Sequence, residues 1–159
     1  MAINSVAIDV SVHYAVAAAD SPAEDLLAAW CQTALQQGGV DAAGGVAVAI
    51  EVVDAAASAS LNNHYRNRDR PTNVLSFPAG DLPAVPDEAR PLGDIVICAP
   101  LVVAEAAEQG KSATAHWCHL VVHGALHLVG FDHVADEDAQ VMMAKEVEIL
   151  DFFGFSDPY

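Results

Sequence analysis

Residues 119–133 contain a pattern of histidine and glycine that restricts what this chain can fold into. His123 and His127 are four residues apart in an apolar stretch that predicts a helix, so both rings project from one helix face. Gly130 permits a left-handed backbone conformation, through which the chain can leave the helix and turn back. This reversal carries His133 toward the two helical rings. We therefore expect three imidazoles to meet at one point.

Three imidazole nitrogens suit Zn²⁺, and three protein ligands rather than four leave a position for water, as in catalytic zinc sites. The sequence predicts one Zn²⁺ per chain, bound by His123, His127 and His133, with an activated water. The spacing i, i+4, i+10 with Gly at i+7 is that of the metzincin peptidases. Those enzymes carry Glu at i+1 as general base, whereas this chain has Gly124, which cannot accept a proton. A peptidase of that type is not expected.

Other polar residues near the motif allow a second ligand assignment. His116 and His119 lie within about 80° of the ligand pair on a helical wheel, so the pair could be shifted one turn earlier. Only His127, however, is close enough to the glycine turn for His133 to meet it. We expect His119 to contact a ligand or line the pocket, and His116 to be a capping or surface residue. Asp132 is expected to fix the turn or to accept a ligand N–H.

Length and composition predict one domain over residues 1–159, since 159 residues with 53% hydrophobic side chains can build a substantial core. No stretch approaches the roughly 18 uninterrupted apolar residues of a membrane span, and the first residues lack the basic side chains of a secretory signal. We expect a cytoplasmic protein that does not bind membranes. Cys31, Cys98 and Cys118 are expected to be free core residues, because their number is odd and none form a close pair.

The formal net charge of −16 disfavours a broad surface for a polyanion, because the field of the whole protein repels one. Three of the six cations, Arg66, Arg68 and Arg70, nevertheless fall within five residues. This cluster predicts one local basic spot, and contact with a nucleic acid should be confined to it.

Hydrophobic periodicity and the placement of proline and glycine predict an α+β fold with one four-stranded mixed sheet covered by about five helices. The expected strands cover residues 6–12, 46–53, 72–77 and 93–98. The histidine motif should lie on a central helix that begins at a Thr114 cap and runs through Leu128. The other helices are expected at 21–38, from the Asp54 cap to before Pro71, at 100–110 and at 136–154.

Three finer expectations concern caps, core and loops. Ser21 and Glu24 predict a capping box for the first helix. The last helix should contribute core side chains at four apolar positions: Val141, Met142, Ile149 and Leu150. The proline-rich connection 78–92 is either a mobile flap or a solvated excursion, and we favour the excursion.

The run from His123 to His133 fits His-Gly-x-Leu-His-Leu-x-Gly-x-Asp-His and resembles the signature of the YbeY family of bacterial metal-dependent endoribonucleases. Three further blocks are similar to that family in the same order. They are Leu61-Asn62 with Tyr65-Arg66, the run Pro71–Pro78, and Leu92–Ile95. The resemblance covers most of the chain after residue 45.

This resemblance implies a single-strand-specific endoribonuclease that acts in maturation of the 16S ribosomal RNA 3′ end and in ribosome quality control. The implied partners are single-stranded and ribosomal RNA and the small ribosomal subunit or its assembly factors, while the oligomeric state stays open. Arg66 matches the arginine of the family's Asn-x-x-Tyr-Arg block, which implies a catalytic role. A guanidinium can hold two phosphate oxygens as negative charge develops on them.

Two other functions compete with this interpretation. A zinc metallopeptidase-like hydrolase is favoured by the ligand spacing and opposed by Gly124. A non-catalytic, zinc-stabilised ribosome-associated binding protein is favoured by the acidic excess and by the absence of a clear general base.

Overall fold

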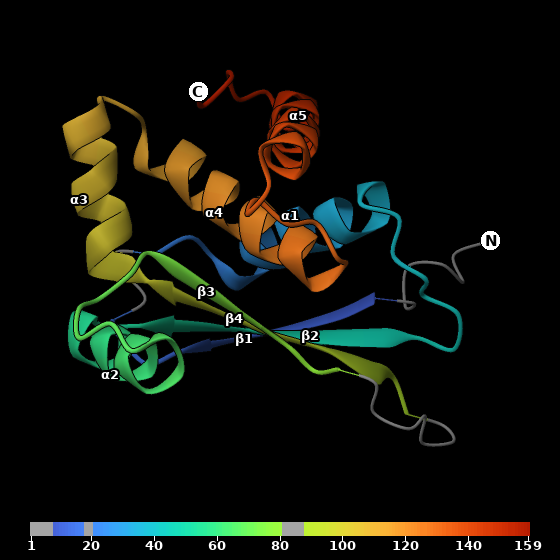
Figure 1. The fold of residues 1–159 in the computed structure, drawn as a ribbon, viewed down its shortest axis with the longest axis horizontal. Helices are drawn as coiled ribbons and strands as arrows, with labels where there is room; N and C mark the ends of the chain where they lie inside the picture. The colour runs from blue at the N-terminus through green and yellow to red at the C-terminus, as the bar shows by residue number, and fades with distance from the viewer. Residues whose placement is uncertain (1–7, 18–20, 81–87) are drawn as a thin grey trace.

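The computed structural model describes residues 8–17, 21–80 and 88–159, which form a four-stranded sheet and five helices (Figure 1). The α+β class and the mixed sheet expected from the sequence are confirmed. The elements in chain order are β1 (Ile8–Tyr14), α1 (Glu24–Gln37), β2 (Val46–Val53), α2 (Ala55–Arg66), β3 (Val74–Pro78), β4 (Arg90–Cys98), α3 (Ala99–Gln109), α4 (Ala113–Leu128) and α5 (Asp136–Phe152).

The sheet has the strand order β1-β2-β4-β3. Strands β1, β2 and β4 are parallel, and β3 runs antiparallel to β4 at the edge of the sheet. Strand β2 covers the residues expected for a buried central strand, and Val46, Ile50 and Val52 are fully buried. Since β3 pairs on one side only, its other side faces the cleft described below.

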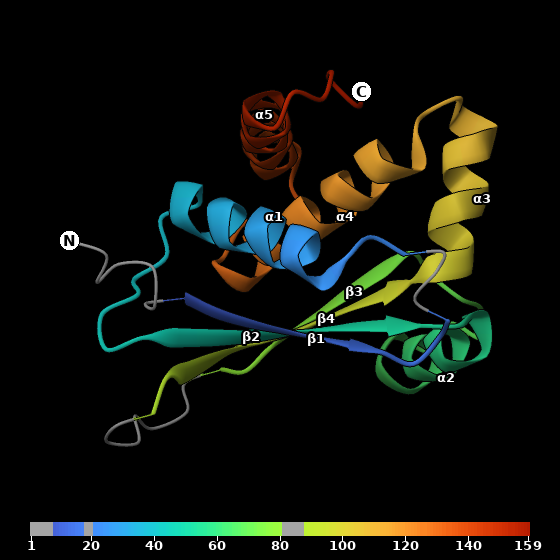
Figure 2. The same ribbon diagram turned by 180° about the vertical axis from the view of Figure 1, so that it is seen from behind.

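The helices cover the two faces of the sheet unequally. Helices α1 and α4 lie over one face, α5 lies above them, and α2 lies on the opposite face (Figures 1 and 2). Helix α4 packs against α1, α3 and α5 and also touches β3 and β4. Its Leu120, Val121 and Leu126 are buried, so the motif helix is central, as expected.

Strand β4 requires glycine at one position. Gly93 has a φ of 145°, and a Cβ there would lie 2.3 Å from the Phe77 carbonyl oxygen of the neighbouring β3. The register between β2 and β4 shifts just before this residue, between Ala47 and Val48. Only a residue without a side chain allows β3 to approach β4 this closely.

Two of the three expected helix caps were wrong. Helix α1 begins after Ala23, whose backbone is extended and whose methyl side chain cannot cap the helix, and the Pro22 carbonyl accepts a 2.6 Å hydrogen bond from the Tyr14 hydroxyl. The Ser21 capping box is therefore absent. Glu24 and Asp25 in the first turn are instead placed to interact favourably with the helix dipole.

Helix α4 starts earlier than its expected cap, Thr114. Ser112 is the N-cap and accepts a 3.1 Å hydrogen bond from the Ala115 N–H, so Thr114 lies inside the first turn. The Asp54 cap of α2 is confirmed, with a 2.8 Å bond from the Ala57 N–H.

Helix α5 buries Met142, Ile149 and Leu150 as expected, but Val141 is 60% exposed. Val141 is one position out of phase with the buried stripe, in which Glu146 occupies a central place. The connection before β4 is shorter than expected because the strand already begins at Arg90; residues 81–87 of that connection lie outside the described residues. None of the described helices is long and apolar enough to cross a membrane.

Candidate metal centre

Three histidines converge at the C-terminal end of α4. One ring nitrogen each of His123, His127 and His133 lies within 4.8 Å of the others. The Nε2 atoms of His123 and His127 are 3.2 Å apart, because residues i and i+4 project from the same helix face. The rings of His127 and His133 have centroids 4.9 Å apart. The structure thus brings together the three residues expected from the sequence.

The loop after α4 brings His133 into the group. Gly130 has a φ of 100°, so the backbone leaves the helix in a left-handed conformation. Asp132 then fixes the turn, since its Oδ1 accepts a 2.7 Å hydrogen bond from the His133 N–H and a 3.3 Å bond from the Val134 N–H. The turn role expected of Asp132 is confirmed.

The donor set fits a metal such as Zn²⁺. Burial lowers the pKa of His127, and the nearby His123 and His133 rings lower it further. A lowered pKa keeps the imidazole neutral, and a neutral imidazole has a lone pair to offer a metal. Three imidazole nitrogens around one point match in number and type the protein ligands of a catalytic rather than a fully closed zinc site.

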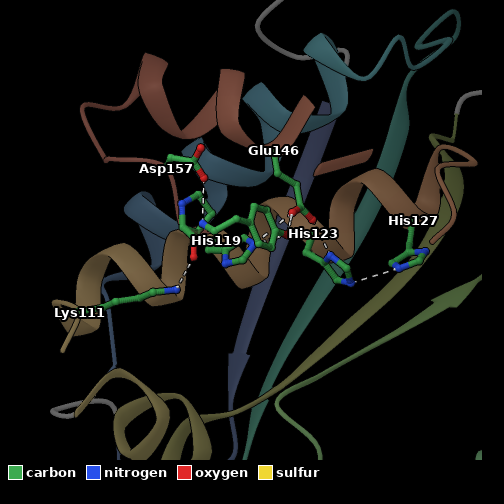
Figure 3. A network of polar contacts seen from close by, with 8 residues as sticks. Lys111, His119, His123, His127, Glu146 and Asp157 are labelled. Atoms are coloured by element: carbon green, nitrogen blue, oxygen red, sulfur yellow. Dashed lines mark hydrogen bonds and ion pairs between the residues drawn. The ribbon is translucent and has the colours of Figure 1, made fainter. Parts of the chain in front are cut away.

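Glu146 on α5 lies against the same histidines (Figure 3). Its Oε2 lies 2.6 Å from His123 Nδ1, and its Oε1 lies 3.1 Å from His119 Nε2 and accepts a hydrogen bond from the Tyr159 hydroxyl. The side chain is only 1% exposed. Burial raises its pKa, but these hydrogen bonds outweigh the effect and hold the pKa at about 2. Glu146 is therefore a buried carboxylate with both oxygens occupied.

Glu146 was not expected near the histidines from the sequence, although a signal for it was present. A glutamate at position 146 falls on the same helical stripe as Met142, Ile149 and Leu150, where an unpaired charge would be costly. A charged residue inside a buried stripe indicates a partner from elsewhere in the fold.

The remaining residues near the motif differ in how well they match expectation. His119 was expected to contact a ligand or line the pocket, but its Nε2 lies 3.1 Å from Glu146 Oε1, and the ring is not among the residues that line the histidine cleft. His116 was expected at a cap or on the surface, but it is buried, and its Nε2 pairs with Glu105 at 2.9 Å. Cys118 is fully buried away from the histidine group, and burial raises the pKa of its thiol to about 12. Cys31 and Cys98 are also free and buried.

The histidines open onto a cleft of about 890 Å³ that also contains the basic cluster. Arg66, Arg68 and Arg70 line it, together with β3 residues and parts of α3. Asn62 holds the loop after α2 in place, since its side-chain amide donates a 2.8 Å hydrogen bond to the Arg70 carbonyl oxygen. The structure thus places Arg66 in the same cleft as the three histidines.

Gly124 lies where α4 packs on the sheet. A Cβ there would lie 2.8 Å from Ile95 Cγ2 and 3.2 Å from Ser76 Oγ. The Ser76 hydroxyl also donates a 3.0 Å hydrogen bond to the Gly124 carbonyl oxygen. Contact with β3 and β4 therefore excludes a side chain at the position where metzincins carry their glutamate.

Comparisons with known proteins match most of the chain to one family. The family model described as endoribonuclease YbeY matches residues 13–154. A protein of Alkalilimnicola ehrlichii named endoribonuclease YbeY is 49% identical over 154 residues, which cover 96% of this chain and 92% of that protein. A protein of the same name from Pseudomonas putida strain W619 is 50% identical over 144 residues, covering 89% and 87%.

A solved structure shares the fold. The solution structure of a Thermotoga maritima protein aligns with a TM-score of 0.57 and 24% identity, covering 91% of this chain and 87% of that one. The family model and the two relatives each cover most of the chain, so the chain belongs to the endoribonuclease YbeY family.

Proposed function

We propose that this chain is a zinc-dependent endoribonuclease that cleaves single-stranded RNA during ribosomal RNA maturation. The observation that carries the proposal is one cleft that contains both the three-histidine group and three arginines. Imidazoles are suited to hold a metal, and guanidinium groups are suited to hold phosphate. The endoribonuclease name shared by the family model and the relatives supports the same reaction.

His123, His127 and His133 would hold one Zn²⁺ ion per chain. When bound, zinc supplies a Lewis acid and makes a water molecule nucleophilic near neutral pH. The protein's part is to keep the His127 imidazole neutral and to direct the three rings at one point. The lowered pKa of His127 and the Asp132 turn both serve that purpose.

Arg66 is the residue proposed to act on the substrate. Its guanidinium can form two parallel hydrogen bonds to non-bridging phosphate oxygens, and these bonds strengthen as negative charge builds up during attack on phosphorus. Arg68 and Arg70 line the same cleft and would attract the backbone of the RNA without a direct part in the reaction. The cleft therefore has one arginine for chemistry and two for attraction.

The finer biology follows from the family resemblance. We propose that the RNA is ribosomal, with the 16S 3′ end as substrate and ribosome quality control as context, and that the small ribosomal subunit or its assembly factors deliver it. The free, buried cysteines fit a reducing compartment, so we propose the cytoplasm. We also propose that residues 1–159 act as one domain, since one core cluster joins strands of the sheet to α1, α4 and α5.

The test is incubation of purified protein with single-stranded and double-stranded RNA of the same sequence, with and without a chelator, followed by analysis of the product ends. We expect cleavage of the single strand only, its loss with chelator, and recovery with added Zn²⁺. Cleavage of casein instead of RNA would indicate a peptidase. Zinc binding without turnover on any substrate would indicate a binding protein.

Metal analysis of four variants tests the ligand set. Replacement of His123, His127 or His133 by Ala should each remove the zinc, because two remaining imidazoles bind it much more weakly. His13→Ala is the control, since that side chain is 72% exposed and pairs with Glu51 on β2. Full zinc content in the His133→Ala protein would contradict the three-ligand site.

A further inference from the structure

Glu146 connects the histidine group to the segment that follows α5. Figure 3 shows its side chain reaching from α5 toward His119 and His123 on α4. The contact joins residues that are 23 positions apart in the sequence, His123 and Glu146, at 2.6 Å. Among the three histidines of the group, Glu146 contacts His123, whose side chain is 25% exposed.

The hydrogen bonds determine which nitrogen of His123 carries the proton. An ionised carboxylate can only accept, so His123 Nδ1 must donate to Glu146 Oε2. In the neutral ring, Nε2 then bears the lone pair. That Nε2 atom is the one lying 3.2 Å from His127 Nε2, at the centre of the histidine group.

Glu146 is itself held from a second direction. The Tyr159 hydroxyl donates to its Oε1, and His119 Nε2 lies 3.1 Å from the same oxygen. These two contacts leave Oε2 free to accept from His123 and restrict rotation of the carboxylate about its last bond.

Several contacts hold the segment 153–159 in the position that Tyr159 needs. Phe155 packs edge-on against the buried Trp30, with ring centroids 6.4 Å apart. Lys111 Nζ donates a 3.2 Å hydrogen bond to the Pro158 carbonyl oxygen, and Asp157 accepts one of 2.8 Å from the Tyr159 N–H. The segment is thus attached to α1, to the loop between α3 and α4, and to its own turn.

We infer that Glu146 is a positioning residue for His123, and that Tyr159 and His119 in turn position Glu146. By fixing the tautomer and direction of the His123 ring, Glu146 presents Nε2 to the metal, and the segment 153–159 thereby helps to build the metal centre. A carboxylate that accepts a hydrogen bond from the second ring nitrogen of a metal-binding histidine raises the basicity of the ring and orients it. This inference rests on the metal site of the proposed function.

The first test measures zinc affinity of Glu146→Gln by competition with a chelating dye. The amide has the same size but can donate as well as accept, so it no longer enforces one tautomer. We expect the affinity to fall about 10- to 100-fold. Glu105→Gln is the matched control, because it alters an equivalent 2.9 Å carboxylate–histidine pair whose His116 lies outside the metal group. Its zinc affinity should equal that of the wild type.

The second test reads the tautomer of His123 in the metal-free proteins by nitrogen-15 NMR of the ring, at a pH where the ring is neutral. Wild type and Glu105→Gln should show one tautomer with the proton on Nδ1, and Glu146→Gln should show a mixture. A merely structural link between α4 and α5 predicts a lower melting temperature for Glu146→Gln with zinc affinity and tautomer unchanged. That result would overturn the inference.

Tyr159→Phe keeps the inference testable if Glu146→Gln does not fold. Loss of the hydroxyl should weaken zinc binding by a smaller factor, about 2- to 10-fold. The control is Tyr14→Phe, which removes a 2.6 Å hydroxyl bond to the Pro22 carbonyl oxygen away from the metal site. In that case equal zinc affinity in the two Phe variants would overturn the inference. If the wild-type protein itself binds no zinc, the proposed function fails, whereas the tautomer measurement on the metal-free proteins still tests whether Glu146 positions the His123 ring.

Discussion

Arg66 is the last residue of α2, and its exposed guanidinium lines the cleft of the histidine group. Asn67, which follows it, ends the helix in a left-handed conformation with a φ of 57°. The chain therefore turns sharply just after Arg66, and the side chain extends from the end of a fixed helix instead of from a free loop. The planar guanidinium fork is preorganised, so an arginine in this position loses less side-chain entropy per hydrogen bond to phosphate than a lysine would.

Arg66→Ala should slow RNA cleavage by about 10²–10³-fold in single-turnover measurements, because one preorganised contact to developing charge is lost. Zinc content and melting temperature should stay unchanged, since the side chain is exposed. Arg66→Lys should restore little of the rate, because an ammonium cannot reproduce the two-pronged hydrogen bonding.

Arg68→Ala is the matched control for this prediction, because Arg68 is also exposed and lines the same cleft. We expect this substitution to weaken RNA binding slightly and to leave the cleavage rate of bound RNA near that of the wild type. If zinc-loaded Arg66→Ala cleaves as fast as Arg68→Ala, the catalytic role of Arg66 is wrong.

At this scale the sequence predicts contacts that are local and misses those that are not. The positions of His123, His127 and His133 follow from helix periodicity and one glycine turn, and the structure brings them together. The pairing of His123 with Glu146 depends on how α5 packs over α4, and the spacing of residues within either helix does not predict that packing. The same reason explains His116, whose burial depends on Glu105 of another helix.

The contact between α4 and β3 determines the shape of the site at the scale of elements. The helix approaches the sheet closely at Gly124, where Ser76 of β3 donates a hydrogen bond to the helix backbone. This bond and the missing side chain bring the edge strand beside the histidine group. The sequence shows only that position 124 has glycine where metzincins have glutamate. The structure adds the reason, since α4 packs too closely on the sheet at this position for a side chain to fit.

Gly124→Ala should destabilise the protein by about 1–2 kcal/mol in chemical denaturation. The added methyl group overpacks the contact with Ile95 at a typical cost of roughly 1–3 kcal/mol, and the better helix propensity of alanine offsets up to about 1 kcal/mol. The effect on stability should come with a shift of β3 relative to the histidines and hence with a lower cleavage rate.

A double-mutant cycle provides the control. In an Ile95→Ala background the added methyl group has room, so the cost of Gly124→Ala should disappear or change sign. An equal cost in both backgrounds would show that contact with Ile95 is not the reason for glycine at this position.

Element boundaries illustrate which local signals were decisive. Asp54 caps the start of α2, Pro100 lies in the first turn of α3, and Gly110 ends α3 in a left-handed conformation. Each of these signals acts within one turn of helix. Thr114 and Ser21 were misjudged because a nearby alternative competed in each case. Ser112 precedes Thr114 and takes the cap, and the extended Ala23 displaces Ser21.

The charge of the whole molecule restricts how RNA can approach. Of the six basic residues, three are engaged outside the cleft: Arg90 donates to the Asp41 carbonyl oxygen, Lys111 to that of Pro158, and Lys145 pairs with Glu148. The other three are the cleft arginines. Against 22 acidic residues, this leaves one small area where a polyanion is attracted.

The salt dependence of RNA binding should therefore be shallow. With at most three phosphate contacts on a single strand, each contributing roughly −0.7, the slope of log K against log salt should be about −2. The measurement is binding of a fluorescent oligonucleotide to zinc-loaded protein over a series of salt concentrations. Replacing Arg68 and Arg70 together by Gln should reduce the slope to about −0.7, because only Arg66 then remains in the cleft.

Arg90→Gln is the control for this series, since Arg90 hydrogen-bonds Asp41 and does not line the cleft. Its slope should equal that of the wild type. A wild-type slope as steep as about −5, or a slope unchanged by loss of Arg68 and Arg70, would require phosphate contacts beyond the three arginines. A shallow slope that follows the cleft arginines alone would instead mean that this acidic protein holds the RNA backbone through these three arginines and not through its overall field.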